Sequence, residues 1–156
     1  MKVGKDKKEE RDVLNAASPD ELALVKGAKE VGFEFLGIQR NVITIRDYYQ
    51  NELQFKLLNT LEFNSTRKRS SVIVETIKGE NEGEIKLITK GADSIIEPLL
   101  NKENESDKNF VYKLIDEFSK IGLRTLTFSE KKLTQEEYDQ FNVEFKKAEN
   151  VVEDRE

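Results

Sequence analysis

The stretch from Phe63 to Arg69 combines an aromatic ring with a basic triplet, Arg67-Lys68-Arg69. A phenylalanine at the start of a turn can serve as a stacking platform for a base, and such stacking contributes about 1–3 kcal/mol per base. The apolar residues that alternate before Phe63 also indicate a core position, which is the commoner place for this residue type. The triplet is typical either of a solvated turn or of a site for a small polyanion.

Lys90 and Arg124 add two cations at the ends of predicted elements. Gly91 follows Lys90, so a ligand could approach the backbone closely there, near the amides of a predicted helix start. Arg124 follows Gly122 at a turn, where its guanidinium could donate a fork of hydrogen bonds to a phosphate. Each cation taken alone is also consistent with an ordinary surface side chain.

The elements that must position these residues begin with a helix. Ser18 is the predicted N-cap, Pro19 suits the first helical position, and Glu21 completes a capping box. Gly32 is the expected stop. A second capping box, Thr134 with Glu137, predicts a carboxy-terminal helix.

Between these helices the pattern is mainly that of strands. Period-two apolar patterns or Val- and Ile-rich runs predict strands over 33–38, 42–46, 53–63, 70–77, 84–90 and 124–129. A short helix is expected over 92–100 and an amphipathic one from Phe110 to Ile121. Neighbouring strands without helices between them favour antiparallel pairing. The predicted fold class is α+β, a mostly antiparallel twisted sheet flanked by helices, with a charged and disordered start over 1–14 and a single domain over 15–156.

Composition excludes several classes of protein. The chain has 156 residues, with 26 Lys and Arg against 31 Asp and Glu, a net charge of -5, whereas a sequence-blind nucleic-acid binder is normally basic. There is no Cys and no His, which excludes thiolate chemistry and His-based triads. Neither a P-loop nor GxGxxG occurs, and no apolar run approaches the roughly 18 residues of a membrane span. We therefore expect a soluble chain without a nucleic-acid partner.

Taken in order, the motifs resemble the nucleotide-binding (N) domain of P-type ATPases, in the versions found in the type IV class, the phospholipid flippases. The resemblance is carried by SPDE at Ser18–Glu21, Glu62-Phe63 with Arg67-Lys68-Arg69 and SVIV, KGAD at Lys90–Asp93, and GLRTL at Gly122–Leu126. It covers about residues 15 to 156.

The resemblance implies an ATP-binding site. Phe63 would stack on adenine, with Lys90 close to the ring and the phosphates. Lys68, with the hydroxyl of Ser65, would hold the nucleotide, and Arg124 would reach toward the phosphates.

Two further positions follow from the resemblance. Glu21 matches an acidic contact that would accept from the exocyclic amine of adenine, a role that competes with its place in the capping box. Ser70 stands where the family commonly has Met, which changes the packing of the pocket but removes no proposed ligand.

The resemblance also implies the wider function. No DKTGT motif occurs, so the chain is expected to bind ATP without hydrolysing it and to contain no catalytic residue. It would deliver ATP to an aspartate in a separate phosphorylation domain, where Mg²⁺ is mainly held, within the cytoplasmic part of an integral membrane protein. An actuator domain and a non-catalytic subunit are further expected partners, and phospholipid would be met only through an absent membrane region.

Two hypotheses from other classes stay open at this point. The Arg67-Lys68-Arg69 turn could belong to a non-catalytic interaction module that binds an acidic partner or nucleic acid. A self-sufficient hydrolase is disfavoured by the absence of His, Cys and a P-loop, although carboxylate pairs remain available.

Overall fold

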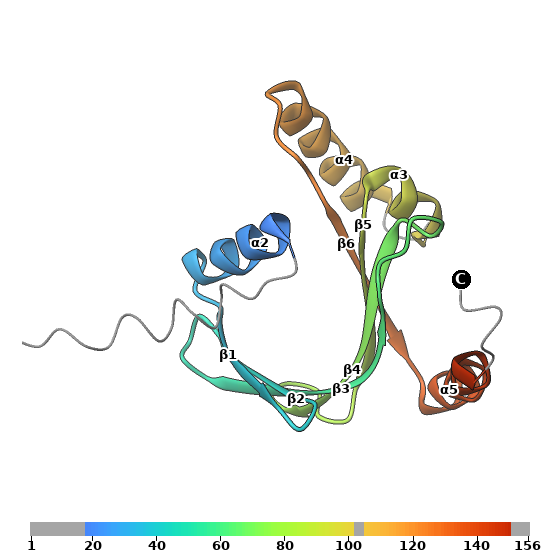
Figure 1. Cartoon of the computed structure of the whole chain (residues 1–156). Coiled ribbons are helices and arrows are strands. Elements are labelled where there is room, and N and C mark those ends of the chain that lie inside the picture. Colours follow the sequence, from blue (N-terminus) through green and yellow to red (C-terminus); the bar gives the residue numbers. More distant parts are fainter. Residues whose placement is uncertain (1–17, 102–104, 151–156) are drawn as a thin grey trace, which may run out of the picture. The chain divides into compact units, whose positions relative to one another are not determined.

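The computed structural model describes residues 18–101 and 105–150, so the predicted charged start over 1–14 lies outside the described residues. The chain forms its elements in the following order (Figure 1): α2 (Pro19–Glu30), β1 (Glu34–Gln39), β2 (Val42–Arg46), β3 (Glu52–Leu61), β4 (Arg69–Lys78), β5 (Ile85–Gly91), α3 (Asp93–Ile96), the 3-10 turn η1 (Glu97–Leu99), α4 (Glu105–Lys120), β6 (Thr127–Leu133) and α5 (Gln135–Asn150).

The strands of the described residues form one sheet in the order β1-β2-β3-β4-β5-β6. The pairs β1–β2, β2–β3, β4–β5 and β5–β6 are antiparallel. Strands that are neighbours in sequence are thus neighbours in the sheet; short loops connect β1 to β5 in turn, whereas α3, η1 and α4 lie between β5 and β6. The predicted α+β class with a mostly antiparallel sheet is confirmed.

The described residues divide into two compact units. Residues 18–56 with 77–80 form the first, and residues 57–76 with 81–101 and 105–150 form the second. In the first unit α2 packs on β1. Ser18 caps α2, because its Oγ accepts a 3.2 Å hydrogen bond from the backbone N–H of Glu21. The helix ends before Gly32, whose φ of 96° is a conformation that glycine adopts without strain.

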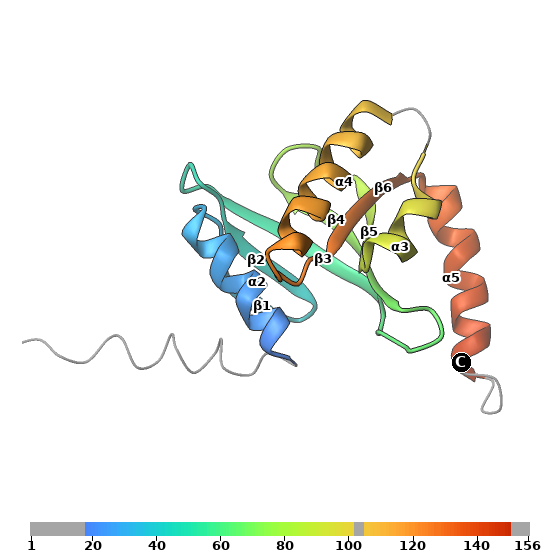
Figure 2. The same ribbon diagram turned by 90° about the horizontal axis from the view of Figure 1, so that it is seen from above.

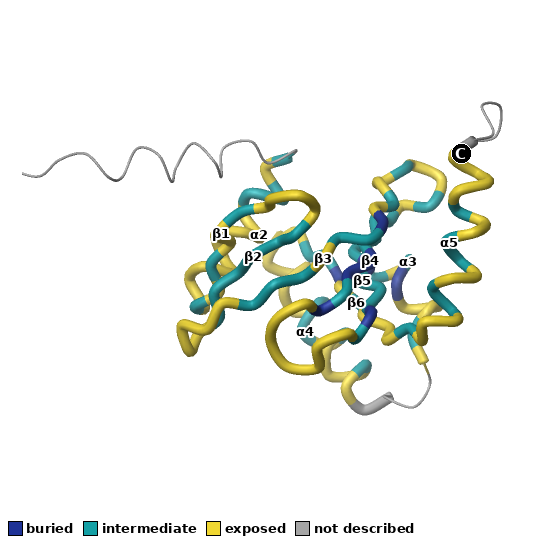
Figure 3. The backbone as a smooth tube through the Cα atoms, turned by 90° about the horizontal axis from the view of Figure 1, so that it is seen from below, coloured by how far each residue is buried: buried dark blue, intermediate teal, exposed yellow. Residues whose placement is uncertain are grey.

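The second unit contains the most deeply buried positions. Its buried apolar side chains are Ile73, Val74, Ile85 and Ile96. Figure 3 shows these buried positions gathered along β4 and β5 and in α3. In the view of Figure 2, α3 and α5 lie beside β5 and β6, and both helices contact β6. This core fixes the ends of β4 and β5, where the candidate site residues lie.

The second capping box, formed by Thr134 and Glu137, is confirmed. The backbone N–H of Glu137 donates to Thr134 Oγ1 at 3.1 Å, and the backbone N–H of Thr134 donates to Glu137 Oε2 at 2.9 Å. These reciprocal bonds satisfy amide groups that the first turn of α5 leaves without a helical partner.

Two strand boundaries differ from the prediction in a way that matters for the site. β3 ends at Leu61, so Phe63 lies outside the strand. β6 begins at Thr127, so the prediction that Arg124 opens a strand is wrong. The reason is that Thr127 pairs with Gly91, the last residue of β5, and the chain turns into α3 immediately afterwards. Residues 124–126 therefore have no β5 partner.

Candidate functional site

Phe63 exposes 63% of its surface. The residue follows the end of β3, whose inward-facing residues end with Leu61. The interpretation of Phe63 as a core residue is therefore wrong, and its ring is accessible to a ligand.

A hydrogen-bonded turn links Phe63 to the basic triplet. Asn64 Oδ1 accepts from the backbone N–H of Arg67 at 2.7 Å, and the Asn64 carbonyl accepts from the backbone N–H of Lys68 at 2.8 Å. The guanidinium of Arg67 donates to the carbonyl of Glu62 at 2.6 Å. Asn64 thus folds its own backbone into an Asx-type turn, which Arg67 closes from the other side.

Lys68 ends this turn in an unusual backbone conformation. Its φ is 52°, in the left-handed region that costs a residue with a Cβ about 1–2 kcal/mol. The side chain is exposed, as is that of Ser65 in the same turn. The hydrogen bond from its backbone N–H to the Asn64 carbonyl helps to hold Lys68 in this conformation, which sets the direction in which its side chain leaves the backbone.

Gly91 brings the turn against the end of β5. A Cβ added to Gly91 would lie 3.1 Å from the carbonyl oxygen of Lys68, 3.2 Å from Arg69 Cβ and 3.2 Å from Ile96 Cδ1. A side chain here would crowd these neighbours, and the close approach places the backbone of Lys68 beside the residue that follows Lys90. The structure therefore brings Lys68 and Lys90 to the same end of the β4–β5 pair.

Arg124 lies near this same end by topology. Thr127 pairs with Gly91, and Arg124 belongs to the exposed segment that leads into Thr127. Phe63, Ser65, Lys68, Lys90 and Arg124 all belong to the second compact unit. The arrangement offers an accessible ring, a hydroxyl and three cations, the groups that a base bearing phosphates requires.

Glu21 belongs to the first compact unit, unlike the other predicted site residues. It lies in the first turn of α2, where its backbone N–H is held by Ser18 Oγ. This contact accounts for its capping position, and its predicted contact with adenine stays a prediction.

Further along β5 and β6 the same face carries a ladder of ion pairs. Lys132 Nζ lies 2.6 Å from Glu84 Oε2, and Lys86 Nζ lies 3.2 Å from Glu84 Oε1 and 3.3 Å from Glu130 Oε1. The hydrogen bond from Lys132 lowers the pKa of Glu84. Burial acts to lower the pKa of Lys86, but its hydrogen bonds to Glu84 and Glu130 raise it overall. These charges neutralise one another and form no ligand site.

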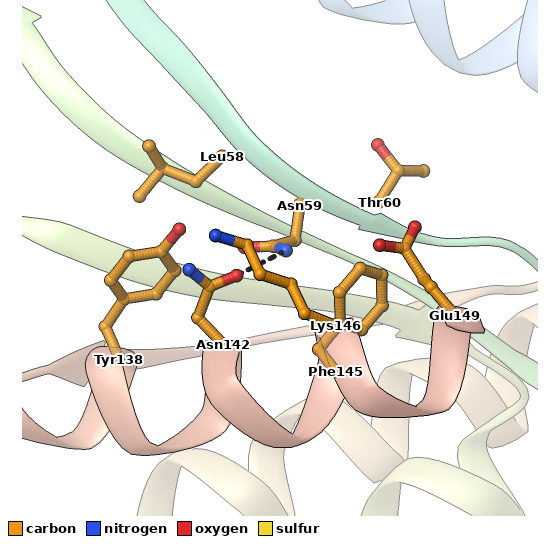
Figure 4. Close-up of a pocket in the computed structure, with 8 residues that line it drawn as sticks. All are labelled: Leu58, Asn59, Thr60, Tyr138, Asn142, Phe145, Lys146 and Glu149. Carbon is orange, nitrogen blue, oxygen red and sulfur yellow. Dashed lines mark hydrogen bonds between the residues drawn. The ribbon is translucent and has the colours of Figure 1, made fainter. Parts of the chain in front are cut away.

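A cavity of about 450 Å³ lies elsewhere in the second unit, between β3 and α5 (Figure 4). It is lined by Leu58, Asn59, Thr60, Tyr138, Asn142, Phe145, Lys146 and Glu149. The amides of Asn59 and Asn142 face each other across it and share a 3.5 Å hydrogen bond. The cavity contains none of the predicted site residues and one basic side chain among its lining, so it suits a triphosphate less well than the end of β4–β5.

Two further features are absent from the described residues. No group of three or more acidic side chains is placed to hold a metal ion in the part of the chain that the structure describes. Over the same residues, no helix is both long and apolar enough to span a membrane.

The role of Asn64 was not predicted from the sequence. Asn64 is not among the predicted site residues, yet it makes the two hydrogen bonds that set the turn. Asparagine at the first position of a turn, three residues before the amide that it captures, was the available signal. The sequence also gave no contact for Arg67 and Arg69; both donate to backbone carbonyls of the turn, to Glu62 and Arg67 respectively.

Comparison with known proteins shows the family of the chain. The sequence profile of the family described as P-type ATPase, cytoplasmic domain N, matches residues 2–155. The chain is 39% identical over 147 residues to phospholipid-transporting ATPase 10 of Arabidopsis thaliana, covering 90% of this chain and 12% of that protein. It is 41% identical over 152 residues to phospholipid-transporting ATPase dnf2 of Schizosaccharomyces pombe, a match that covers 97% of this chain and 10% of that protein. The identity with phospholipid-transporting ATPase 11C of Mus musculus is 39% over 142 residues, and this match covers 90% of this chain and 12% of that protein.

The chain therefore spans about a tenth of the length of these relatives. The family profile covers nearly the whole chain, and the relatives carry the activity that the ordered motifs SPDE, RKR, KGAD and GLRTL indicate. The resemblance to the nucleotide-binding domain of type IV P-type ATPases is thereby confirmed. The chain belongs to the P-type ATPase cytoplasmic domain N family.

Proposed function

We propose that this chain is the ATP-binding domain of a phospholipid-translocating P-type ATPase. The observation that carries the proposal is the turn from Phe63 to Lys68, which has an exposed ring at its start and a cation at its end. The carbonyl of Lys68 approaches Gly91 beside Lys90. An apolar ring and positive charge are thus held close together by the fold itself.

The two kinds of side chain would serve the two parts of ATP. The adenine stacks on Phe63, while Lys68, Lys90 and Arg124 contact the phosphates and Ser65 adds a hydroxyl. The contacts are partly exposed, so the net binding free energy is about 4–6 kcal/mol, which corresponds to a Kd between about 1 mM and tens of micromolar.

In the parent protein the domain would present ATP to the aspartate of a separate phosphorylation domain. The described residues suit a polyanion rather than a bare cation, so Mg²⁺ would arrive with ATP and be held mainly by that other domain. The phosphorylation and actuator domains are the proposed partners on the cytoplasmic side of the membrane. A non-catalytic subunit and the transported phospholipid would be met by other parts of the protein.

The structure disfavours the alternative of a basic patch for nucleic acid or an acidic partner. Arg67 and Arg69 use their guanidinium groups on carbonyls of their own turn, those of Glu62 and Arg67. Both side chains are partly buried and lie against the turn, and the net charge of -5 also disfavours a polyanion partner as large as nucleic acid.

The experiment that tests the proposal compares ATP binding by the wild type, Phe63→Ala and Phe118→Ala. Phe118 is a matched control, because it exposes 44% of its surface on α4, in the same unit. Loss of a stacked base should weaken binding about tenfold for Phe63→Ala, with no change for Phe118→Ala. Isothermal titration measures the affinities, and an assay of phosphate release should find no hydrolysis. Equal affinities for the two variants, with both folded, would remove the stacking role.

A further inference from the structure

Phe128 lies directly opposite Lys90 in the β5–β6 pair, and Ser70 lies opposite Lys90 in the β4–β5 pair. Residues that face each other across antiparallel strands project from the same face of the sheet, with Cβ atoms roughly 4.5–5.5 Å apart. Ser70, Lys90 and Phe128 therefore form a row of a small polar residue, a cation and a ring.

Core packing does not explain the ring of Phe128. The residue exposes 53% of its surface, whereas its neighbour Thr127 exposes 8%. Alternation along a strand sends these two side chains to opposite faces of the sheet, so the burial of Thr127 does not extend to Phe128. The ring of Phe128 is thus exposed to solvent, next to Lys90 of the candidate site.

The remainder of this face of β5–β6 is built differently. Beyond the row, the ion pairs of Lys86 with Glu130 and of Lys132 with Glu84 occupy it. At Lys90 the residue opposite is an aromatic ring rather than a carboxylate. The face changes from an ion-pair ladder to a cation beside a ring at the end of the strands, where Gly91 approaches Lys68.

We infer that Phe128 is a second residue that contacts the purine base, on the far side of Lys90 from Ser70. Its ring supplies apolar surface to the base beside the methylene stem of Lys90, and the ammonium stays directed to the phosphates. The inference rests on the proposed function and adds a residue to the same site.

The test measures amide-shift titrations of the wild type, Phe128→Ala and Phe110→Ala with ATP, adenosine and tripolyphosphate. Phe110 is a matched control in the same unit, with 64% of its surface exposed on α4. Loss of a base contact should weaken the binding of ATP and of adenosine by Phe128→Ala about fivefold to tenfold. Tripolyphosphate, which has no base, should bind the variant as it binds the wild type, and Phe110→Ala should change none of the three affinities.

Two results overturn the inference while leaving the proposed function in place. One is an unchanged affinity of folded Phe128→Ala for ATP and adenosine. The other is equal weakening of all three ligands, because Phe128 would then act only on the placement of Lys90. If Phe128→Ala does not fold, Phe128→Leu is used instead, because it keeps the apolar volume without the ring. This variant should bind ATP more weakly than the wild type and tripolyphosphate equally well. A wild type that binds no ATP contradicts both proposals, and no variant is needed to see it.

Discussion

Asn64 and Arg67 are joined by a 2.7 Å hydrogen bond from the backbone N–H of Arg67 to Asn64 Oδ1. This bond sets the separation between Phe63, which precedes the turn, and Lys68, which ends it. Phe63 and Lys68 have different proposed roles toward one ligand. Asn64, which has no proposed contact with the ligand, places both.

Removing this acceptor should loosen the turn. Asn64→Ala loses a hydrogen bond that contributes about 0.5–1.5 kcal/mol, so we expect faster amide exchange at Arg67 and Lys68 and threefold to tenfold weaker ATP binding. Hydrogen exchange and isothermal titration measure the two effects. Asn109→Ala, at an exposed position of α4, serves as the control. Unchanged exchange at Arg67 would show that the turn does not depend on Asn64.

A side chain at Gly91 should destabilise the chain. Gly91→Ala places a methyl group 3.1 Å from the Lys68 carbonyl oxygen, so overpacking should lower the free energy of unfolding by about 1–3 kcal/mol. Gly27→Ala is the matched control. Its Cβ meets nothing within 4 Å on α2, and it should instead stabilise the chain by about 0.5–1 kcal/mol. Urea unfolding measures the change in the free energy of unfolding for both variants. A Gly91→Ala chain as stable as the wild type would contradict the close approach.

The charge of Lys68 can be separated from its backbone conformation. Asparagine also adopts positive φ readily, so Lys68→Asn should keep the turn and the stability while weakening ATP binding about threefold to tenfold. Lys113→Asn removes the same charge from an exposed position on α4. Isothermal titration at low and moderate salt should show a loss for Lys68→Asn only. Equal losses for both variants would indicate a general effect of net charge.

The capping box of α5 predicts a specific pH dependence. Hydrogen bonds from Lys131 and from the backbone N–H of Thr134 lower the pKa of Glu137. Its contribution to stability is therefore complete above the unfolded-state value of about 4.3 and is lost as the pH falls through the lower folded-state pKa.

Glu137→Gln isolates this contribution, because the amide oxygen still accepts from Thr134 but carries no charge. The difference in free energy of unfolding between wild type and variant should be present at neutral pH and should shrink as the pH falls below about 4. Denaturant unfolding across this range measures it. A difference that does not vary with pH would contradict the lowered pKa.

Local signals predicted much of the fold, and long-range pairing decided the rest. Ser18 and the Thr134–Glu137 box marked helix starts within one residue, because capping depends on side chains three positions apart. The start of β6 was predicted too early. It depends on the pairing of Thr127 with Gly91, where β5 ends, and the local sequence does not show this long-range pairing.

The candidate site divides in the same way. The residue types of Phe63, Lys68 and Lys90 were evident from the motifs, yet the exposure of Phe63 could not be read from alternation, since β3 stops at Leu61. The approach of Lys68 to Gly91 arises from two segments that the sequence separates by more than twenty residues. The role of Phe128 likewise depends on the register of β5 with β6.

The central claim is that this chain binds ATP at the end of β4–β5 through Phe63, Lys68, Lys90 and Arg124. An amide-shift titration of the chain with ATP tests it most directly. The account predicts saturable shifts clustered at residues 63–70, 90–91 and 124–128, with a Kd between about 1 mM and tens of micromolar. No shifts at several millimolar ATP, or shifts confined to other parts of the chain such as the β3–α5 cavity, would contradict it.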